Sequence, residues 1–348
     1  MTTLNHRHHH HHHPVKKTRI LLFGIPFLLV VAMALQQLTQ SEWFDPTVGS
    51  RVARLAVTHY LAPRFAADAT VETTREAVDT ISRLALLPRG TKVERVEVAG
   101  RPAEWVLASS VLPFATKTIL YLHGGGFYSG SPATHRELAA RLSRASGVRV
   151  LLPDYRLAPE NPFPAANEDC LAAYEWLLKN GVSAGNIVLG GDSAGGCLAL
   201  MTLLSIKEKG LPMPAAAFFL SPLTDAVHHD GESYATRAEA DPWFTPASVP
   251  AHMARYIGNK PPAVQPAILS PVRMDLSGLP PLLIQVGDDE ILLSDSTRLA
   301  ERAQKAGVDA TLEVCPHMWH VFQTFGVMVP EARDAVDRIG AFVRRKLS

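Results

Sequence analysis

Apolar residues near the start of the chain recur at the spacing of a helix. Between residues 41 and 89 they are separated by three or four positions, as in Val52, Leu55, Ala56 and Tyr60. This spacing places the apolar side chains on one face of a helix. We therefore predict two or three helices before residue 90.

Apolar and polar residues then alternate over two short stretches on either side of Gly100. The apolar positions are Val93, Val96, Val98, Ala103, Trp105 and Leu107. A period of two is typical of half-buried strands. The pattern predicts an antiparallel hairpin.

Six short, dense apolar runs follow, and longer stretches at helical spacing separate them. The runs are Thr118–Leu122, Val148–Leu152, Ile187–Leu189, Ala216–Leu220, Leu282–Val286 and Ala310–Val314. The helical stretches are Arg136–Ala145, Asn167–Lys179, Ala194–Lys209 and Ser296–Lys305. Each run is too short for a helix, which favours a buried parallel strand. With the hairpin, this alternation predicts an α/β fold with a mostly parallel, eight-stranded sheet flanked by helices.

The alternation stops between residues 225 and 266, where histidine, aspartate, proline and aromatic residues gather. We interpret this segment as an insertion near the substrate. Together with residues 41–90 it would form a helical cap, so that residues 41–348 make one catalytic domain. We expect His228 and His229, in the insertion, to be solvated.

Residues 1–40 differ from the rest of the chain. Six consecutive histidines at 8–13 are typical of a purification tag or of a natural metal-binding tract. Three basic residues then precede an apolar run at 20–35, with a small-x-small site at Ala32–Ala34. The run indicates a cleaved export signal or a membrane anchor, and either would carry the catalytic domain across the membrane. Without such targeting the protein would be cytoplasmic.

Composition narrows the class of protein. Hydrophobic residues make up 47% of the chain and charged residues 19%, as in packed globular enzymes. The net charge of +1 gives no field that would attract nucleic acid, so we expect no such partner. Cys170, Cys197 and Cys315 are spaced too widely for a zinc motif or a disulfide framework, and we expect buried thiols. The sequence does not set the oligomeric state, and a dimer is compatible with it.

The strongest chemical signal is the string GDSAG at residues 191–195, between a predicted strand and a predicted helix. In this context it predicts a nucleophile elbow, in which a sharp turn between flanking glycines exposes the hydroxyl of Ser193 above the sheet. The string alone also occurs at plain helix caps, where the serine side chain satisfies backbone N–H groups. Other residues must decide between the two.

A second motif, HGGG at residues 123–126, follows directly on the strand that ends at Leu122. Such a loop points backbone N–H groups at an oxyanion. We expect Gly124, Gly125 and Ala194 to donate to the oxyanion, and His123 to orient the loop by hydrogen bonding.

These motifs, HGGG and GDSAGG, together with DYRLAPE at 154–160, resemble the hormone-sensitive-lipase family, and bacterial esterases in particular. The resemblance covers about residues 93–342, and AEWV at 103–106 is similar to a subgroup that includes monoterpene lactone hydrolases. It implies the α/β-hydrolase fold and hydrolysis of small esters with short to medium acyl chains. It implies no cofactor and no metal. We expect the 154–160 stretch to be structural, with Arg156 paired to a carboxylate.

In this family the acid follows the next-to-last strand, where this chain has Gly287–Asp295 with four carboxylates. The family pattern is Asp-Pro-Leu-x-Asp, and Glu290 aligns best with its first position. Glu290 is therefore the predicted acid and Asp288 the second choice, a departure that leaves this role open. We expect the other acids to be solvated or to cap the following helix.

Two histidines, His317 and His320, compete for the role of base after the last predicted strand. His320 matches the family's His-x-Phe position and completes the order serine, acid, histidine that is typical of α/β hydrolases. It would take the proton of Ser193, which attacks the ester, and water would then hydrolyse the acyl-enzyme. The residues expected to line the acyl pocket are Phe127, Tyr128, Trp243 and Phe244.

The same residues leave rival functions open. An acyltransferase or a lactone hydrolase would use the same acyl-enzyme. A ligand receptor on this fold would lack the histidine, and a membrane-tethered binding module would lack part of the site, so retention of all three residues favours an esterase.

Overall fold

The computed structural model describes residues 46–347. The predicted histidine tract and the apolar segment 20–35 lie outside the described residues, so the proposed signal or anchor stays a prediction. Within the described part of the chain, no helix is both long and apolar enough to span a bilayer.

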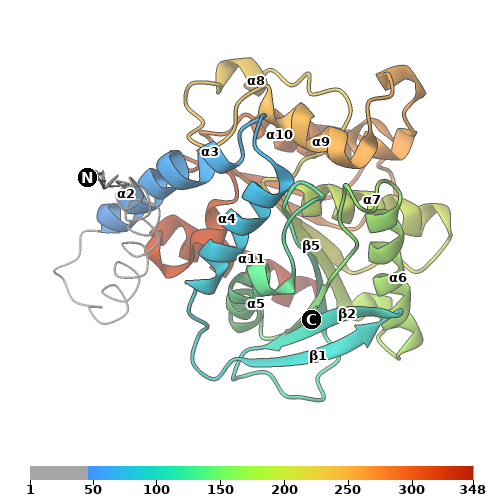
Figure 1. The fold of residues 1–348 in the computed structure, drawn as a ribbon. Coiled ribbons are helices and arrows are strands. Elements are labelled where there is room, and N and C mark those ends of the chain that lie inside the picture. Colours follow the sequence, from blue (N-terminus) through green and yellow to red (C-terminus); the bar gives the residue numbers. More distant parts are fainter. Residues whose placement is uncertain (1–45, 348) are drawn as a thin grey trace, which may run out of the picture.

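A single eight-stranded sheet lies at the centre of the described structure (Figure 1). Its strands are β1 (Lys92–Val98), β2 (Arg101–Leu107), β3 (Thr118–Leu122), β4 (Arg149–Pro153), β5 (Ile187–Asp192), β6 (Ala216–Leu220), β7 (Leu282–Gly287) and β8 (Ala310–Cys315). They follow the spatial order β1-β2-β4-β3-β5-β6-β7-β8. Only β2 runs against its neighbours, since its pairs with β1 and β4 are antiparallel and all other pairs are parallel. The predicted mostly parallel, eight-stranded α/β sheet is confirmed.

Helices connect these strands and cover the sheet. They are α2 (Pro46–Ala56), α3 (Ala62–Arg64), α4 (Val71–Arg83), α5 (Pro132–Ser146), α6 (Ala165–Lys179), α7 (Ala194–Glu208), α8 (Ser233–Thr236), α9 (Ser248–Ile257), α10 (Leu293–Lys305) and α11 (Pro330–Lys346). A π-helical turn, η1 (Val57–Leu61), joins α2 to α3, and the 3₁₀ segments are η2 (Ala184–Asn186), η3 (Pro262–Val264), η4 (Ala267–Leu269), η5 (Pro271–Arg273) and η6 (Phe322–Met328). Helix α11 is not among the helices predicted above. The three cysteines are buried and unpaired, as predicted.

Alternate side chains of the central strands pack into two hydrophobic cores, one on each face of the sheet. In β3, Leu120 and Leu122 pack in the cluster that includes α6, α7 and α10, whereas Ile119 and Tyr121 pack in the cluster that includes α5 and α11. Successive side chains of a strand point to opposite faces, so a strand covered by helices on both faces must be apolar at every position. This explains why the buried strands are short unbroken apolar runs.

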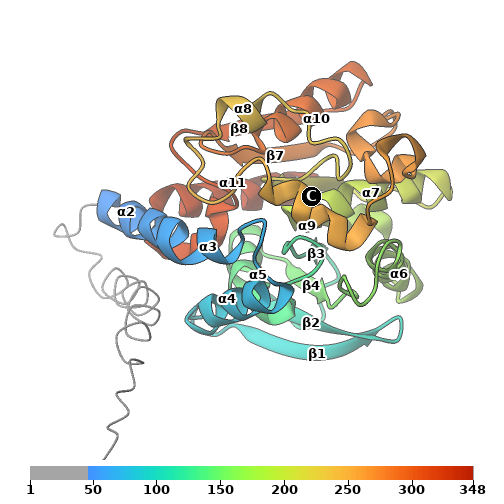
Figure 2. The same ribbon diagram turned by 45° about the horizontal axis from the view of Figure 1, so that its top comes forward.

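The two segments predicted to form the cap contact each other (Figure 2). Phe65, which follows α3, packs edge-on against Trp243, with ring centroids 5.3 Å apart. His252 and Arg255 on α9 donate hydrogen bonds to the carbonyl oxygens of Phe65 and Ala69, over 2.7 and 2.6 Å. Burial lowers the pKa of His252 to about 4. Its ring is therefore neutral at ordinary pH and is held by the N-terminal segment.

Candidate active site

The motifs found in the sequence converge at the carboxyl ends of the parallel strands. The HGGG loop follows β3, Ser193 follows β5, the acid-rich loop follows β7 and the His320 loop follows β8. Since the carboxyl ends of parallel strands meet at one edge of a sheet, the sheet brings together residues that are far apart in sequence.

Ser193 occupies the sharp turn between β5 and α7. Its backbone has φ of 54° and ψ of −122°, a conformation that L residues rarely adopt and that the surrounding structure must hold in place. Its N–H donates to Leu220 O over 3.0 Å. A Cβ atom on Gly195 would lie 2.0 Å from Leu122 O, so only glycine permits this close approach of backbone to backbone.

His320 joins Ser193 to Glu290 in one chain of hydrogen bonds. Its Nε2 lies 2.8 Å from Ser193 Oγ and its Nδ1 lies 2.9 Å from Glu290 Oε1. Because a carboxylate only accepts, Nδ1 carries the proton, which leaves Nε2 free to accept from the serine hydroxyl. His317, the competing histidine, is exposed.

Glu290 is fully buried, and its second oxygen has partners of its own. Oε2 accepts from Ser221 Oγ over 2.7 Å and from the Gly287 N–H over 2.5 Å. The Ser221 hydroxyl in turn accepts from the Val321 N–H, next to His320, over 3.0 Å. Ser221, which sequence reasoning did not single out, therefore links Glu290 to the loop that carries His320.

Asp288, the second choice for the acid, points elsewhere. Its carboxylate accepts from Arg237 over 3.1 Å, and its side chain is 41% exposed. The hydrogen-bond geometry at His320 thus favours Glu290 over Asp288.

The HGGG loop differs in one respect from the prediction. The N–H of Gly124 donates to Asp192 Oδ1 over 3.0 Å and so is already occupied, which makes the expectation that Gly124 faces an oxyanion wrong. The N–H groups of Gly125, Gly126 and Ala194 have no hydrogen-bond partner among residues 46–347, and all three residues line the cavity at Ser193. Gly126 was missed because three adjacent glycines look alike in sequence.

Buried polar side chains hold this loop. Tyr121 and His135 bind the Asp192 carboxylate at 2.7 and 3.0 Å. Burial alone would raise the pKa of Asp192, but these partners and the Gly124 N–H outweigh it and keep the pKa below its ordinary value. Burial also lowers the pKa of His123 to about 3, and its Nδ1 lies 2.7 Å from Gly124 O. The neutral His123 ring thus contacts the loop as predicted.

A cavity of about 210 Å³ opens above Ser193. Three of the four predicted pocket residues, Tyr128, Trp243 and Phe244, line it. Trp243 and Phe244 meet the His320 ring edge-on, with centroids 5.7 and 4.9 Å away. Phe127 does not line the cavity, because its positive φ of 68° turns the side chain into the core, where it stacks on Tyr256 at 4.5 Å. The prediction for Phe127 is therefore wrong.

Comparisons with known proteins agree with this fold. The family described as the alpha/beta hydrolase fold matches residues 119–324. An acetyl-hydrolase of Streptomyces hygroscopicus is 42% identical over 249 residues, which cover 72% of this chain and 81% of the relative. A crystal structure of a mutant of the esterase E40 superimposes with a TM-score of 0.81 at 41% identity, covering 88% of this chain and all of that one.

A crystal structure of an esterase from the bacterial hormone-sensitive lipase family is 39% identical. It has a TM-score of 0.77 and covers 94% of this chain and 98% of its own. The chain belongs to the hormone-sensitive-lipase family. It is a carboxylic ester hydrolase that acts on small-molecule esters.

The other carboxylates of the acid loop of this ester hydrolase bind neighbouring segments. Asp289 accepts from Arg54 of α2 over 3.0 Å, and Asp288 accepts from Arg237 of the insertion. Asp295 is buried and accepts from the Thr224 N–H over 2.8 Å. The expectation that these acids are solvated or cap a helix is wrong for Asp289 and Asp295, because each accepts from a donor that is distant in sequence. Asp288 is 41% exposed and so is partly solvated while it binds Arg237.

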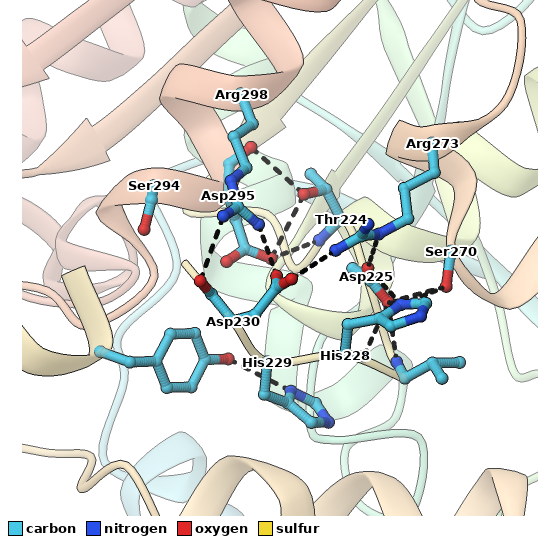
Figure 3. Close-up of polar contacts among 12 residues, drawn as sticks. Thr224, Asp225, His228, His229, Asp230, Ser270, Arg273, Ser294, Asp295 and Arg298 are labelled. Atoms are coloured by element: carbon cyan, nitrogen blue, oxygen red, sulfur yellow. Dashed lines mark hydrogen bonds and ion pairs between the residues drawn. The ribbon is translucent and has the colours of Figure 1, made fainter. Parts of the chain in front are cut away.

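The insertion histidines lie in a polar cluster beside Asp295, at the start of α10 (Figure 3). Asp225 is central to it and binds the ring of His228 at 2.9 Å and Arg273 at 2.7 Å. His229 is half-buried, and burial lowers its pKa. The prediction that His228 is solvated is confirmed, since this residue is exposed, whereas His229 is half-buried and departs from the prediction.

The DYRLAPE segment connects the cap to the sheet. Arg156 pairs with Asp169 at 2.9 Å, the kind of partner that was predicted. Glu160 accepts two hydrogen bonds, over 2.7 and 2.8 Å, from Arg75 of α4. Arg75 also donates to the carbonyl oxygens of Tyr128 and Ala158, over 2.7 and 2.9 Å. One guanidinium therefore ties α4 to the end of the glycine loop.

Proposed function

We propose that this ester hydrolase is a serine carboxylesterase that acts through an acyl-enzyme. Ser193 is the nucleophile, His320 the general base and Glu290 the acid that orients and stabilises the imidazolium. The observation that carries the proposal is the unbroken chain Ser193 Oγ, His320, Glu290, with contacts of 2.8 and 2.9 Å.

The first step of the proposed reaction is attack on the ester carbonyl. His320 Nε2 takes the hydroxyl proton while Ser193 Oγ bonds to the carbonyl carbon, and the carbonyl oxygen becomes an oxyanion. We assign the N–H groups of Gly125, Gly126 and Ala194 as donors to this oxyanion, because they have no partner among residues 46–347 and their residues line the cavity. A single such donor contributes about 2.7–4 kcal/mol in a comparable enzyme.

The remaining steps return the site to its starting state. The tetrahedral intermediate collapses, and His320 gives its proton to the departing alcohol. Water then attacks the acyl-serine with His320 as base, and the carboxylic acid leaves. The apolar wall around Ser193, including Leu223, Met253 and Leu292, favours acyl chains of short to medium length.

The test is hydrolysis of p-nitrophenyl acetate, butyrate, octanoate and palmitate by the wild type, Ser193→Ala and Glu290→Gln, with Asp288→Asn as the matched control. We expect activity that is highest on acetate to octanoate, loss of at least a thousandfold in Ser193→Ala, and a deep loss in Glu290→Gln but not in Asp288→Asn. Full activity of Ser193→Ala would refute the mechanism. If the wild type opened lactones but cleaved none of these esters, the proposed substrate class would change from open-chain esters to lactones.

A further inference from the structure

We propose that Arg54, on helix α2, is a positioning residue of the active site. Its guanidinium holds together the loop that carries Glu290, the loop that carries His320 and the insertion that carries Trp243. The inference rests on the proposed roles of Glu290 and His320.

The three contacts of Arg54 reach three separate segments. Nη1 donates to Asp289 Oδ2 over 3.0 Å and to His317 O over 3.2 Å, and Nη2 donates to Ala240 O over 3.0 Å. Asp289 directly precedes Glu290, and His317 lies three residues before His320. A planar guanidinium with several fixed donors is suited to joining groups in this way.

The loops of the acid and the base are already paired through their backbones. The Asp288 N–H donates to Cys315 O and the Asp289 N–H donates to Met318 O, each over 3.0 Å. These bonds fix the register of the two loops but leave the Asp289 carboxylate and the His317 carbonyl without a partner other than Arg54 among the described residues. Arg54 therefore adds a side-chain link at the junction of these two loops, between the Asp289 carboxylate and the His317 carbonyl.

The insertion meets the same junction through Asp241, the residue after Ala240. Its half-buried carboxylate accepts from the N–H groups of Trp243, Phe244 and Ile291, over 2.8, 3.0 and 2.9 Å. Ile291 follows Glu290 directly. Arg54 thus holds Ala240, and the next residue, Asp241, holds both the aromatic residues that contact His320 and the backbone beside Glu290.

Helix α2 is held in place by contacts that do not involve Arg54. Ala53, Ala56 and Val57 are fully buried in a cluster with Trp319 and Phe322. The Arg54–Asp289 pair is partly exposed, with side chains 37% and 19% accessible, so solvent screens it and it adds little to global stability. A variant that lacks the guanidinium is therefore expected to fold with α2 docked.

The decisive comparison is Arg54→Gln against Arg51→Gln. Arg51 lies one turn earlier on the same helix, is exposed and has no hydrogen bond or ion pair within residues 46–347. Both variants remove one positive charge from α2. We expect Arg54→Gln to lower kcat about 10–100-fold on acetate and butyrate alike with KM within about twofold, because displacement of catalytic groups by about 1 Å costs up to about 100-fold. Arg51→Gln should match the wild type.

A double-mutant cycle tests the path through Asp289. Asp289→Asn should lower kcat in the same direction as Arg54→Gln, and the double variant should be no worse than Arg54→Gln alone. Asp289→Asn also keeps the proposal testable if Arg54→Gln does not fold. Thermal unfolding of each variant is measured alongside.

The outcomes separate this inference from the proposed function. A wild type without esterase activity contradicts the function itself. An active wild type with equal kcat in Arg54→Gln and Arg51→Gln overturns the positioning role. A rise in KM confined to the longer esters also overturns it, because Arg54 would then act only on the wall of the acyl pocket.

Discussion

At the scale of single residues, Ser221 supports the hydrogen-bonded chain of Ser193, His320 and Glu290. It is fully buried, donates to Glu290 and accepts from the Val321 N–H. We expect Ser221→Ala to lower kcat/KM about 10–100-fold, because a hydrogen bond to a charged group contributes about 1.5–3 kcal/mol. Kinetics on p-nitrophenyl butyrate would measure this. Ser221→Cys, which is not β-branched and so suits the positive φ of 45° here, keeps a weak donor and serves as the control. Equal losses in both variants would point to packing instead.

The residues of the site differ in how far sequence could identify them. The proposed roles of Ser193 and His320 follow from motif and chain order, since both residues lie in local turns after strands. The HGGG string does not reveal which of its N–H groups are free. The Gly124 N–H is bound by Asp192, which lies 68 residues later in the sequence. Ser221 gave no signal, since a serine after a strand is common.

At the scale of elements, Arg75 holds helix α4 in its position beside the cavity. The side chain binds Glu160 and two carbonyl oxygens, and the same helix presents Val78 and Ile81 to the cavity. We expect Arg75→Gln to raise KM for octanoate more than for acetate, several-fold against less than twofold, because the apolar wall is no longer held. The matched control is Arg83→Gln on the same helix. Equal effects on both substrates would contradict this role of α4.

The elements also show where sequence patterns succeed. The strands were predictable because burial on both faces demands unbroken apolar runs that few other structures use. Helix α11 was missed although Ala332, Ala335, Val336 and Ile339 recur at helical spacing and are buried, so the signal was present. The contacts of α9 with Phe65 and Ala69 could not be predicted, because nothing local specifies which segments of the cap meet.

At the scale of the whole molecule, buried carboxylates make stability depend on pH. Burial raises the pKa of Asp295 from 3.8 to about 7, and the nearby charge of Asp225 adds to the effect (Figure 3). Between about pH 4 and 7 the unfolded chain has lost this proton and the folded chain retains it. The folded state therefore loses stability as pH rises through this window.

The prediction is that Asp295→Asn removes this loss. Its side-chain oxygen still accepts from Thr224, so urea unfolding should show the variant gaining roughly 1–4 kcal/mol relative to the wild type between pH 5 and pH 8. Asp230→Asn is the control: Arg298 and Arg273 hold the pKa of Asp230 at about 2, below this window. Its difference from the wild type should be the same at both pH values. A constant difference for Asp295→Asn as well would disprove the assignment.

The contact between Arg54 and His317 also orders events in time. The two residues are 263 positions apart, so at about 5–20 residues per second their synthesis is separated by roughly 13–53 seconds. Throughout this interval α2 exists without Trp319 and Phe322, the residues that form its seat. Every nascent chain that stops before β8 therefore lacks both the proposed base, His320, and the surface against which α2 packs. Under the proposed mechanism, ester cleavage therefore begins only after the loop that carries His320 has been synthesised.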